Sequence, residues 1–438
     1  MTRNMVYFND ALAETVGFLR KVKFPASVEP LVIRDLNGRI RIALKGGNKE
    51  KHRDLEARIG EKMSLLAPFV GGGANGVLFP DDFFDPDSVF NHPDILDLLL
   101  PEADKPVRLL DRQIVGQDWL RPAPGVPTCH RIVFFGIKGG VGRSTAMSIA
   151  AYHLARTGKR VLLIDFDLES PGLSGLLLPP ERLSDFGMVD WFIEDAVGQG
   201  EAVLKRMISV SPLSEYTQGE IRVAAAMGLD EKFYLAKLSR VFAEVSSDNR
   251  VERFSQRANR LVAALEAQEK PDVVLIDSRA GLHDLAAVSI VGLSTVALLF
   301  AVDSAQTWQA YRLLFSQWQC YPSVLKRLRD RLVVVEALFP EANQAERARL
   351  FLENVYKLFS ETIYEQIEAG GDHDPEIFNF DLNDTSAPHH PLLIKWNNRF
   401  QEFNPLMLPE GVLTEAEIAA TFGDFLKGLD RLTEGGTT

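Results

Sequence analysis

The sequence predicts an α/β fold: a mostly parallel sheet covered by helices on both faces, joined to a small N-terminal α+β domain. Three observations predict this fold. After residue 130, short apolar segments alternate with helical stretches, which is the pattern of a parallel sheet. Several of these segments are apolar throughout, as expected of strands that are buried on both faces. A glycine-rich turn at 138–142 separates the first such segment from a helix.

Charge and composition exclude several classes of protein. The 438 residues include 48 Lys plus Arg and 60 Asp plus Glu, and the net charge of -12 argues against a general nucleic-acid coat or a polybasic membrane binder. Cys129 and Cys320 cannot build a disulfide framework, and without a CxxC pair they cannot alone hold zinc or an iron–sulfur cluster. The N-terminus lacks the apolar core of a signal peptide, and the longest apolar runs fall far short of the roughly 20 residues of a membrane-spanning helix. We therefore expect a cytoplasmic protein with no membrane partner.

Proline punctuation divides the chain near residues 121–127, where three prolines fall within seven residues. Because proline removes a backbone donor and resists helix formation, this stretch has the chemistry of a linker. We expect an accessory domain over residues 1–125 and the α/β domain over residues 126–438. The sequence does not reveal the role of the accessory domain.

The N-terminal segment has its own pattern of short strands and helices. Leu31–Leu44 predicts two strands joined by Asn37-Gly38 in a type I′ turn, in which both central residues take a positive φ. A polar helix is expected over residues 49–66. The stretch Pro80–Asp118 is acidic, but its aspartates lack the spacing, the Gly and the terminal Glu of an EF-hand loop. This stretch therefore predicts a solvated loop rather than a calcium site.

The second domain can be predicted strand by strand. Its expected strands are Ile132–Gly136, Arg160–Asp165, Ile221–Ala225, Val273–Asp277, Val296–Val302, Leu332–Ala337 and Ile377–Phe380. A late helix is expected where Thr414 and Glu417 form a capping box. Its apolar residues then fall on one face: Ile418, Phe422, Phe425, Leu429 and Leu432. This helix should therefore pack on the core rather than on a membrane.

The segment Ile132–Thr145 is the most informative. A strand leads into Lys138-Gly139-Gly140-Val141-Gly142-Arg143-Ser144-Thr145, and a helix follows. Glycines let backbone N–H groups close around phosphate oxygens, and the dipole at the helix N-terminus adds positive potential. The sequence therefore predicts a loop that binds a polyphosphate. An ordinary phosphate loop would carry glycine and lysine where this chain has Ile137 and Arg143.

Apart from Arg143, the loop matches the deviant Walker A pattern Lys-Gly-Gly-x-x-Lys-[Ser/Thr]. It therefore resembles the ParA/MinD family of ATPases, which is distinguished by the early lysine, here Lys138. Two further segments carry the resemblance. Asp165-Phe166-Asp167 resembles the family's switch I, and Asp272–Leu282 resembles its Walker B strand running into switch II. The resemblance covers residues 130–435 and implies a P-loop NTPase fold that uses ATP and Mg²⁺.

The resemblance implies a role for each matching residue. Those implied to bind the nucleotide are Lys138, Gly139, Gly140, Val141, Gly142, Arg143, Ser144, Thr145 and Gly281, the last through an amide that senses the γ-phosphate. Ser144, Asp165 and Asp277 would hold Mg²⁺. Asp167 would orient the attacking water, so the expected catalytic residues are Lys138, Asp167 and Arg143. Lys138 would reach across a nucleotide-sandwich homodimer that closes around ATP.

Two cations depart from the family pattern. Arg143 is planar, longer and fork-shaped, so a slot sized for lysine does not accept it without adjustment. Either the pocket has adapted and Lys138 supplies the point charge, which leaves a slow ATPase, or the site binds nucleotide and scarcely hydrolyses it. We expect the first. Arg279 either reaches the γ-phosphate or forms a salt bridge to the helix that follows it.

Other candidate contacts carry weaker signals. The resemblance implies base contacts from the loops after the late strands, here Glu336–Pro340 and Phe380–Asp384, although each single residue there is more typical of a surface loop. The nearby His389-His390 pair predicts a turn, because no further metal ligands surround it in sequence. Glu231–Arg260 is the best candidate for a DNA-binding face, but its small surplus of cations is typical of a solvated helix. Nonspecific DNA is therefore a less favoured partner.

The expected function is a Mg²⁺-dependent, ATP-hydrolysing switch that dimerises around ATP and regulates a partner protein. Variants with this arginine resemble a bacterial group found beside multi-component stress or defence systems, and that likeness is an analogy of family. A nucleotide-sensing scaffold with little or no hydrolysis is the first alternative. A DNA-partitioning ATPase is the second.

Overall fold

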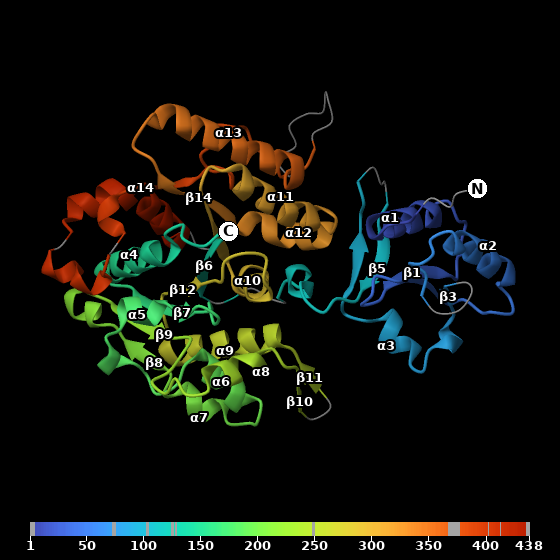
Figure 1. The fold of residues 1–438 in the computed structure, drawn as a ribbon, viewed down its shortest axis with the longest axis horizontal. Helices are drawn as coiled ribbons and strands as arrows, with labels where there is room; N and C mark the ends of the chain where they lie inside the picture. The colour runs from blue at the N-terminus through green and yellow to red at the C-terminus, as the bar shows by residue number, and fades with distance from the viewer. Residues whose placement is uncertain are drawn as a thin grey trace. The chain divides into compact units, whose positions relative to one another are not determined.

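The computed structural model describes residues 5–71, 76–101, 105–123, 127, 129–247, 250–366, 377–401, 403–411 and 413–434. These residues group into two compact units (Figure 1). The first unit contains Met1–Arg121 and Ser316–Arg327, and the second contains Pro122–Phe315 and Leu328–Thr438. The expected domain boundary at residues 125 and 126 lies outside the described residues.

The first unit is built on a mixed sheet with the order β3-β2-β1-β5-β4. Its strands are β1 (Glu29–Arg34), β2 (Ile40–Lys45), β3 (Val77–Leu78), β4 (Ile95–Leu98) and β5 (Val107–Asp111). Its helices are α1 (Phe8–Leu19), α2 (Arg53–Ser64) and α3 (Pro86–Phe90), while α12 (Pro322–Leu328) comes from the late segment. β1 pairs antiparallel with β2 and parallel with β5. With its mixed sheet and its helices, this unit has the predicted α+β class.

The predicted β1–β2 hairpin forms, but its turn differs from the prediction. The Asp35 carboxylate accepts hydrogen bonds from the N–H groups of Asn37 and Arg39, both at 2.9 Å. Gly38 takes a φ of +78°, whereas Asn37 is not among the residues with positive φ. The type I′ prediction is therefore wrong. The Asp35 side chain stabilises a longer loop in which only Gly38 needs the left-handed conformation.

The second unit contains an eight-stranded sheet within the described part of the chain, in the order β15-β14-β13-β6-β12-β7-β9-β8. Its strands are β6 (His130–Gly136), β7 (Arg160–Asp165), β8 (Ile208–Val210), β9 (Glu220–Ala224), β12 (Val273–Asp277), β13 (Val296–Ala301), β14 (Leu332–Phe339) and β15 (Leu392–Lys395). Every neighbouring pair is parallel except β8 and β9. The predicted mostly parallel sheet is confirmed.

One predicted strand is wrong, and two strands of the eight-stranded sheet were not predicted. Residues 377–380 form no strand; instead, the rings of Phe378 and Phe380 pack on Tyr364 at centroid distances of 5.8 and 5.5 Å. The apolar pattern there reflects an aromatic cluster. β15 takes the sheet edge beside β14, and β8 adds an antiparallel strand beside β9.

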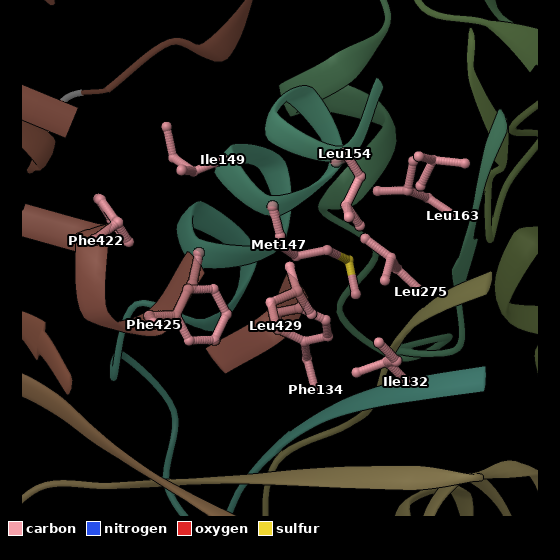
Figure 2. Close-up of a cluster of buried hydrophobic side chains, with 14 of the residues drawn as sticks. Ile132, Phe134, Met147, Ile149, Leu154, Leu163, Leu275, Phe422, Phe425 and Leu429 are labelled. Atoms are coloured by element: carbon pink, nitrogen blue, oxygen red, sulfur yellow. The ribbon is translucent and has the colours of Figure 1, made fainter. Parts of the chain in front are cut away.

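Helices cover both faces of this sheet. On one face lie α4 (Arg143–Arg156) and α14 (Glu415–Glu434), whose side chains join those of the strands in one hydrophobic cluster (Figure 2). On the other face, Phe135 of β6 packs against Tyr311 of α11 (Ala305–Gln319) at 6.2 Å. The remaining helices are α5 (Leu173–Leu177), α6 (Met188–Asp195), α7 (Gly200–Leu204), α8 (Tyr234–Val241), α9 (Phe254–Glu269), α10 (Asp284–Ala287) and α13 (Gln344–Thr362); a π-helical turn spans Val288–Leu293, and β10 (Val245–Ser247) pairs with β11 (Arg250–Glu252).

The late helix packs as its sequence predicts. The N–H of Thr414 donates to the Glu417 carboxylate at 2.8 Å and the N–H of Glu417 donates to the Thr414 hydroxyl at 3.2 Å, which is a capping box. Phe425 is fully buried, and its ring lies 6.2 Å from that of Phe134 and 6.3 Å from that of Phe300. The apolar face of α14 therefore packs against the core of the second unit. Among the helices that the structure describes, none combines the length and the apolar character that crossing a membrane requires.

Candidate functional site

The glycine-rich loop joins β6 to α4, and its conformation depends on glycine. Gly140 and Gly142 have φ values of +74° and +78°, in the left-handed region that side chains rarely adopt. Gly142 is the N-cap residue of α4, and its carbonyl accepts from the N–H of Ala146 at 2.9 Å. The amides of the first helical turn have no partners within the helix, so they favour an anion at this position.

Two neighbouring strands each place an aspartate beside this loop. Asp165 ends β7 and Asp277 ends β12, and the two residues are paired in the parallel register. Both are buried, at 0% and 4% exposure. The Ser144 hydroxyl, on the first turn of α4, donates to Asp277 Oδ2 at 3.1 Å. The structure thus brings together the three residues expected to hold a metal ion.

Burial disfavours the ionised forms of these carboxyl groups. Burial, followed by repulsion from Asp277, raises the pKa of Asp165 well above its usual range. Burial raises the pKa of Asp277 to about 6, although Arg143 and the Ser144 hydroxyl oppose the shift. Within the described residues, Asp277 Oδ1 is buried without a hydrogen-bond partner. A divalent cation would neutralise the two charges and satisfy this oxygen, so the donor set fits Mg²⁺.

A cage of protein ligands does not form around this position. No group of three or more His, Cys, Asp or Glu side chains is close enough to ligate a metal ion in the part of the chain that the structure describes. Mg²⁺ beside a phosphate loop does not need such a cage, because it retains several waters and shares phosphate oxygens with one or two protein groups. Ser144 and Asp277, which are joined by a hydrogen bond, provide the two oxygen groups that such a site would use.

Arg143 points toward the carboxylates rather than away from the sheet. One guanidinium nitrogen, Nη1, donates to the carbonyl of Ser278 and lies 4.0 Å from Asp277 Oδ1. The other, Nη2, lies 3.9 Å from Asp167 Oδ2. The side chain is only 10% exposed. The fork of the arginine therefore spans two acidic residues and one backbone carbonyl, which a lysine ammonium could not do from the same position.

Asp165 anchors the segment that contains Asp167. Its carboxylate accepts from the N–H groups of Asp167 at 3.1 Å, Gly172 at 3.3 Å and Leu173 at 3.2 Å. Tyr234 of α8 adds a hydrogen bond from its hydroxyl to the carbonyl of Leu168 at 2.7 Å. The carboxylate of Asp165 therefore already has three donors, so its contribution to the site includes shaping the backbone around Asp167.

Asp167 lies between two guanidinium groups. Arg143 is 3.9 Å away on one side and Arg279 is 3.7 Å away on the other, both beyond hydrogen-bond distance. Its Oδ1 is buried and has no hydrogen-bond partner in the described ranges. Burial raises the pKa of Asp167, and the two cations oppose that shift. An acceptor that is buried, unpaired and beside the loop is suited to hold a water molecule.

Arg279 forms its closest contact with a residue that the sequence did not single out. Its Nη2 lies 2.8 Å from Glu169 Oε2, and His283 Nε2 lies 3.2 Å from the other oxygen of Glu169. Of the two alternatives for Arg279, a salt bridge is present in the structure, but its partner is Glu169 and not the helix that follows. Glu169 follows Asp167 by two residues in the loop after β7, and Arg279 lies in the loop after β12. The opposite charges of Glu169 and Arg279 were the sequence signal that could have identified this pair.

Two further predicted residues are engaged elsewhere in this state. The N–H of Gly281 donates to the carbonyl of Gly136 at 3.2 Å, and Gly281 has a φ of +84°. The Lys138 ammonium donates to the side-chain oxygen of Gln306 on α11. Both groups therefore have hydrogen-bond partners within the protein in this structure.

A pocket of about 340 Å³ opens beside the loop. It is lined by Gly140, Val141, Gly142, Thr145, Leu338, Ile394, Lys395, Trp396, Asn397, Phe400, Gln401, Thr421 and Phe422. Of the two loops expected to contact a base, the one at 336–340 contributes Leu338, whereas residues 380–384 do not line this pocket. The segment after β15 does, and it was missed because β15 was missed.

His389 and two arginines of the basic segment have partners within the protein. His389 is fully buried, and its ring nitrogens bond the Tyr364 hydroxyl at 2.5 Å and the Leu382 carbonyl at 3.0 Å. Arg257 is also fully buried and pairs with Asp195 at 3.1 Å. Arg260 pairs with the same Asp195 at 2.8 Å. The expectation of a solvated basic face is wrong at Arg257, and both Arg257 and Arg260 pair with a carboxylate of the same unit.

The fold and the loop define this unit as a P-loop nucleotide-binding domain. Residues 132–305 match the family model described as the CobQ/CobB/MinD/ParA nucleotide binding domain. The chromosome-partitioning ATPase Soj of Thermus thermophilus is 53% identical over 54 residues, which are 12% of this chain and 21% of that relative's length. Residues 132–305 are therefore similar to the nucleotide-binding domains of the ParA/MinD family.

Two solved structures of the family resemble the chain at low identity. The structure of pNOB8 ParA bound to nonspecific DNA is 17% identical, with a TM-score of 0.42, and covers 70% of this chain and 100% of its own. MinD of Aquifex aeolicus is 14% identical, with a TM-score of 0.42, and covers 71% and 99%.

The buried Glu336 of β14 should make the stability of the protein depend on pH. It is 4% exposed, and burial, followed by repulsion from Asp303, raises its pKa from 4.5 to about 8. Between these two values the folded state keeps a proton that the unfolded state releases. The free energy of unfolding should therefore fall as pH rises from 4.5 to 8, by at most about 1.4 kcal/mol per pH unit.

Glu336→Gln should remove this dependence, because glutamine keeps the shape and cannot ionise. Urea unfolding at pH 5, 7 and 9 should show the variant gaining stability relative to the wild type as pH rises. The exposed Glu353, which pairs with Arg349 on α13, provides a control in Glu353→Gln. Parallel pH profiles for the wild type and Glu336→Gln would contradict the assignment.

Proposed function

We propose that the second unit is a Mg²⁺-dependent switch that binds and slowly hydrolyses ATP, closes into a homodimer around it and so regulates a partner protein. The observation that carries the proposal is the contact of Ser144 with the buried Asp277 at the foot of the glycine-rich loop. A hydroxyl on the first helical turn and a carboxylate at the end of a neighbouring strand are what a phosphate-bound Mg²⁺ requires.

Each residue of the site has a part in this proposal. Gly139–Thr145 binds the phosphates through backbone amides, with Arg143 adding a positive charge close to them. Ser144 and Asp277 hold Mg²⁺, which when bound draws charge from the phosphate oxygens, and Asp165 supports them. Asp167 accepts a hydrogen bond from the attacking water and fixes its direction. Lys138 leaves Gln306 to contact phosphates bound to a second subunit.

A scaffold that binds nucleotide with little hydrolysis is the second candidate. The Arg143 guanidinium lies between Asp167 and Asp277, and the Gly281 amide is bonded to Gly136. A site that stays in this arrangement with ATP bound would hold the nucleotide without aligning water. The two candidates differ in phosphate release and agree in nucleotide binding.

Binding of ATP by the purified protein, with and without Mg²⁺, tests the shared part of the proposal. We expect Mg²⁺ to tighten binding, and Ser144→Ala to reduce affinity in Mg²⁺ by about tenfold with little change in chelator. The exposed Ser239 of α8 provides a control in Ser239→Ala. The proposal would be overturned if ATP does not bind. It would also be overturned if the wild type and Ser144→Ala each bind ATP equally well with Mg²⁺ and with a chelator.

A further inference from the structure

Glu169 connects the two loops that flank the site. Its carboxylate lies 2.8 Å from Arg279 Nη2 on one oxygen and 3.2 Å from His283 Nε2 on the other. Glu169 belongs to the loop after β7, whereas Arg279 and His283 belong to the loop after β12. The contact therefore links the loop that contains Asp167 to the loop that contains Arg279.

Arg279 is shared unequally between two carboxylates. It is at ion-pair distance from Glu169 but 3.7 Å from Asp167 Oδ1, an oxygen with no hydrogen-bond partner among the described residues. Asp167 is also 3.9 Å from Arg143 of the glycine-rich loop, so its carboxylate lies within 4.0 Å of both guanidinium groups. Glu169 therefore forms the closer ion pair with the Arg279 guanidinium.

The ion pair between Glu169 and Arg279 is partly exposed to solvent, so it can open and close. The side chains of Arg279, Glu169 and His283 are 26%, 31% and 39% exposed. An ion pair in this environment is weak, because water screens it and competes for both groups. A phosphate oxyanion binds arginine through charge-assisted, often bidentate hydrogen bonds, and it is the stronger competitor. Arg279 can therefore exchange a carboxylate for a phosphate at little cost.

We propose that Glu169 is a positioning residue that holds Arg279 off the nucleotide until a γ-phosphate competes for it, so that the pair distinguishes a nucleoside triphosphate from a diphosphate. This inference rests on the proposed function, because it assumes that the loop binds nucleotide. A purely structural ion pair between the two loops would stabilise the fold without favouring either nucleotide.

Calorimetric titration with ADP and with a non-hydrolysable ATP analogue, both with Mg²⁺, tests the inference on the full chain. Glu169→Gln should tighten the analogue by about fivefold and leave ADP within about twofold, because Arg279 is released. Arg279→Gln should weaken the analogue by about tenfold and leave ADP unchanged. The double variant should match Arg279→Gln, since Glu169 acts only through Arg279.

Glu215→Gln is the matched control, because it breaks an ion pair of 2.9 Å with Arg182 at the surface of the same unit. It should change neither affinity. The inference is overturned if Glu169→Gln shifts both nucleotides equally, or if the double variant keeps the gain of Glu169→Gln. Should Glu169→Gln not fold, an unchanged ratio of the two affinities in Arg279→Gln overturns it alone. If the wild type binds neither nucleotide, the proposed function fails as well.

Discussion

Replacing Asp167 with alanine should reduce phosphate release by at least about a hundredfold, which is the loss typical for removal of a group that orients the nucleophile. Asp167 Oδ1 is buried, has no hydrogen-bond partner in the described ranges and lies between Arg143 and Arg279. The acceptor is therefore available to a water molecule without breaking an existing bond. Nucleotide affinity should change by less than about threefold, since the amides of the loop are untouched.

Single-turnover phosphate release at saturating ATP and Mg²⁺ is the measurement for this variant, together with the affinity for ATP. Asp167→Asn keeps the shape of the side chain and should lose the activity to a similar extent. Asp185→Ala is the control, because Asp185 pairs with Arg206 at 2.9 Å on the surface of the same unit. Equal and slow phosphate release from the wild type and Asp167→Ala would favour the scaffold.

The phosphate loop could be predicted because its chemistry is local. Gly140 and Gly142 need left-handed backbone, and the helix that begins at Arg143 supplies the amides and the dipole. The same holds for the strands that end at Asp165 and Asp277. Both are continuous apolar runs, and parallel strands place their C-terminal ends at one edge of the sheet. Local sequence was therefore enough to bring these carboxylates together.

Other parts of the site depend on tertiary contacts that leave no periodic signal. The pocket beside the loop includes Trp396, which follows the short edge strand β15, and four residues are too few to show a pattern. Residues 377–380 do show an apolar pattern, but their aromatic rings pack on Tyr364. Arg257 is another case, since only the fold shows that it is buried against Asp195. Burial of a charged side chain is decided by its partner, and the partner is distant in sequence.

Arg143→Lys should lower both nucleotide affinity and phosphate release, each by about tenfold. The guanidinium donates to the Ser278 carbonyl while it lies 3.9 Å from Asp167 and 4.0 Å from Asp277. A lysine at the first residue of α4 has a shorter side chain that ends in a single ammonium group. It cannot contact the Ser278 carbonyl and both carboxylates at the same time. Because Arg143 opposes the rise in the pKa of both Asp167 and Asp277, its loss would also favour their neutral forms, which are poorer acceptors for water and for Mg²⁺.

The same substitution distinguishes two cases: a pocket that is adapted to arginine, and a pocket in which the arginine slows hydrolysis. Affinity and phosphate release should both fall in Arg143→Lys and fall further, by about a hundredfold, in Arg143→Ala, which removes the charge altogether. Arg156→Lys is the control, because it makes the same change on the same helix at an exposed pair with Glu415. Faster phosphate release by Arg143→Lys would contradict the adapted pocket, since it would mean that the contact with Ser278 holds the cation away from the phosphates. The arginine would then restrain hydrolysis, and lysine at this position would relieve that restraint.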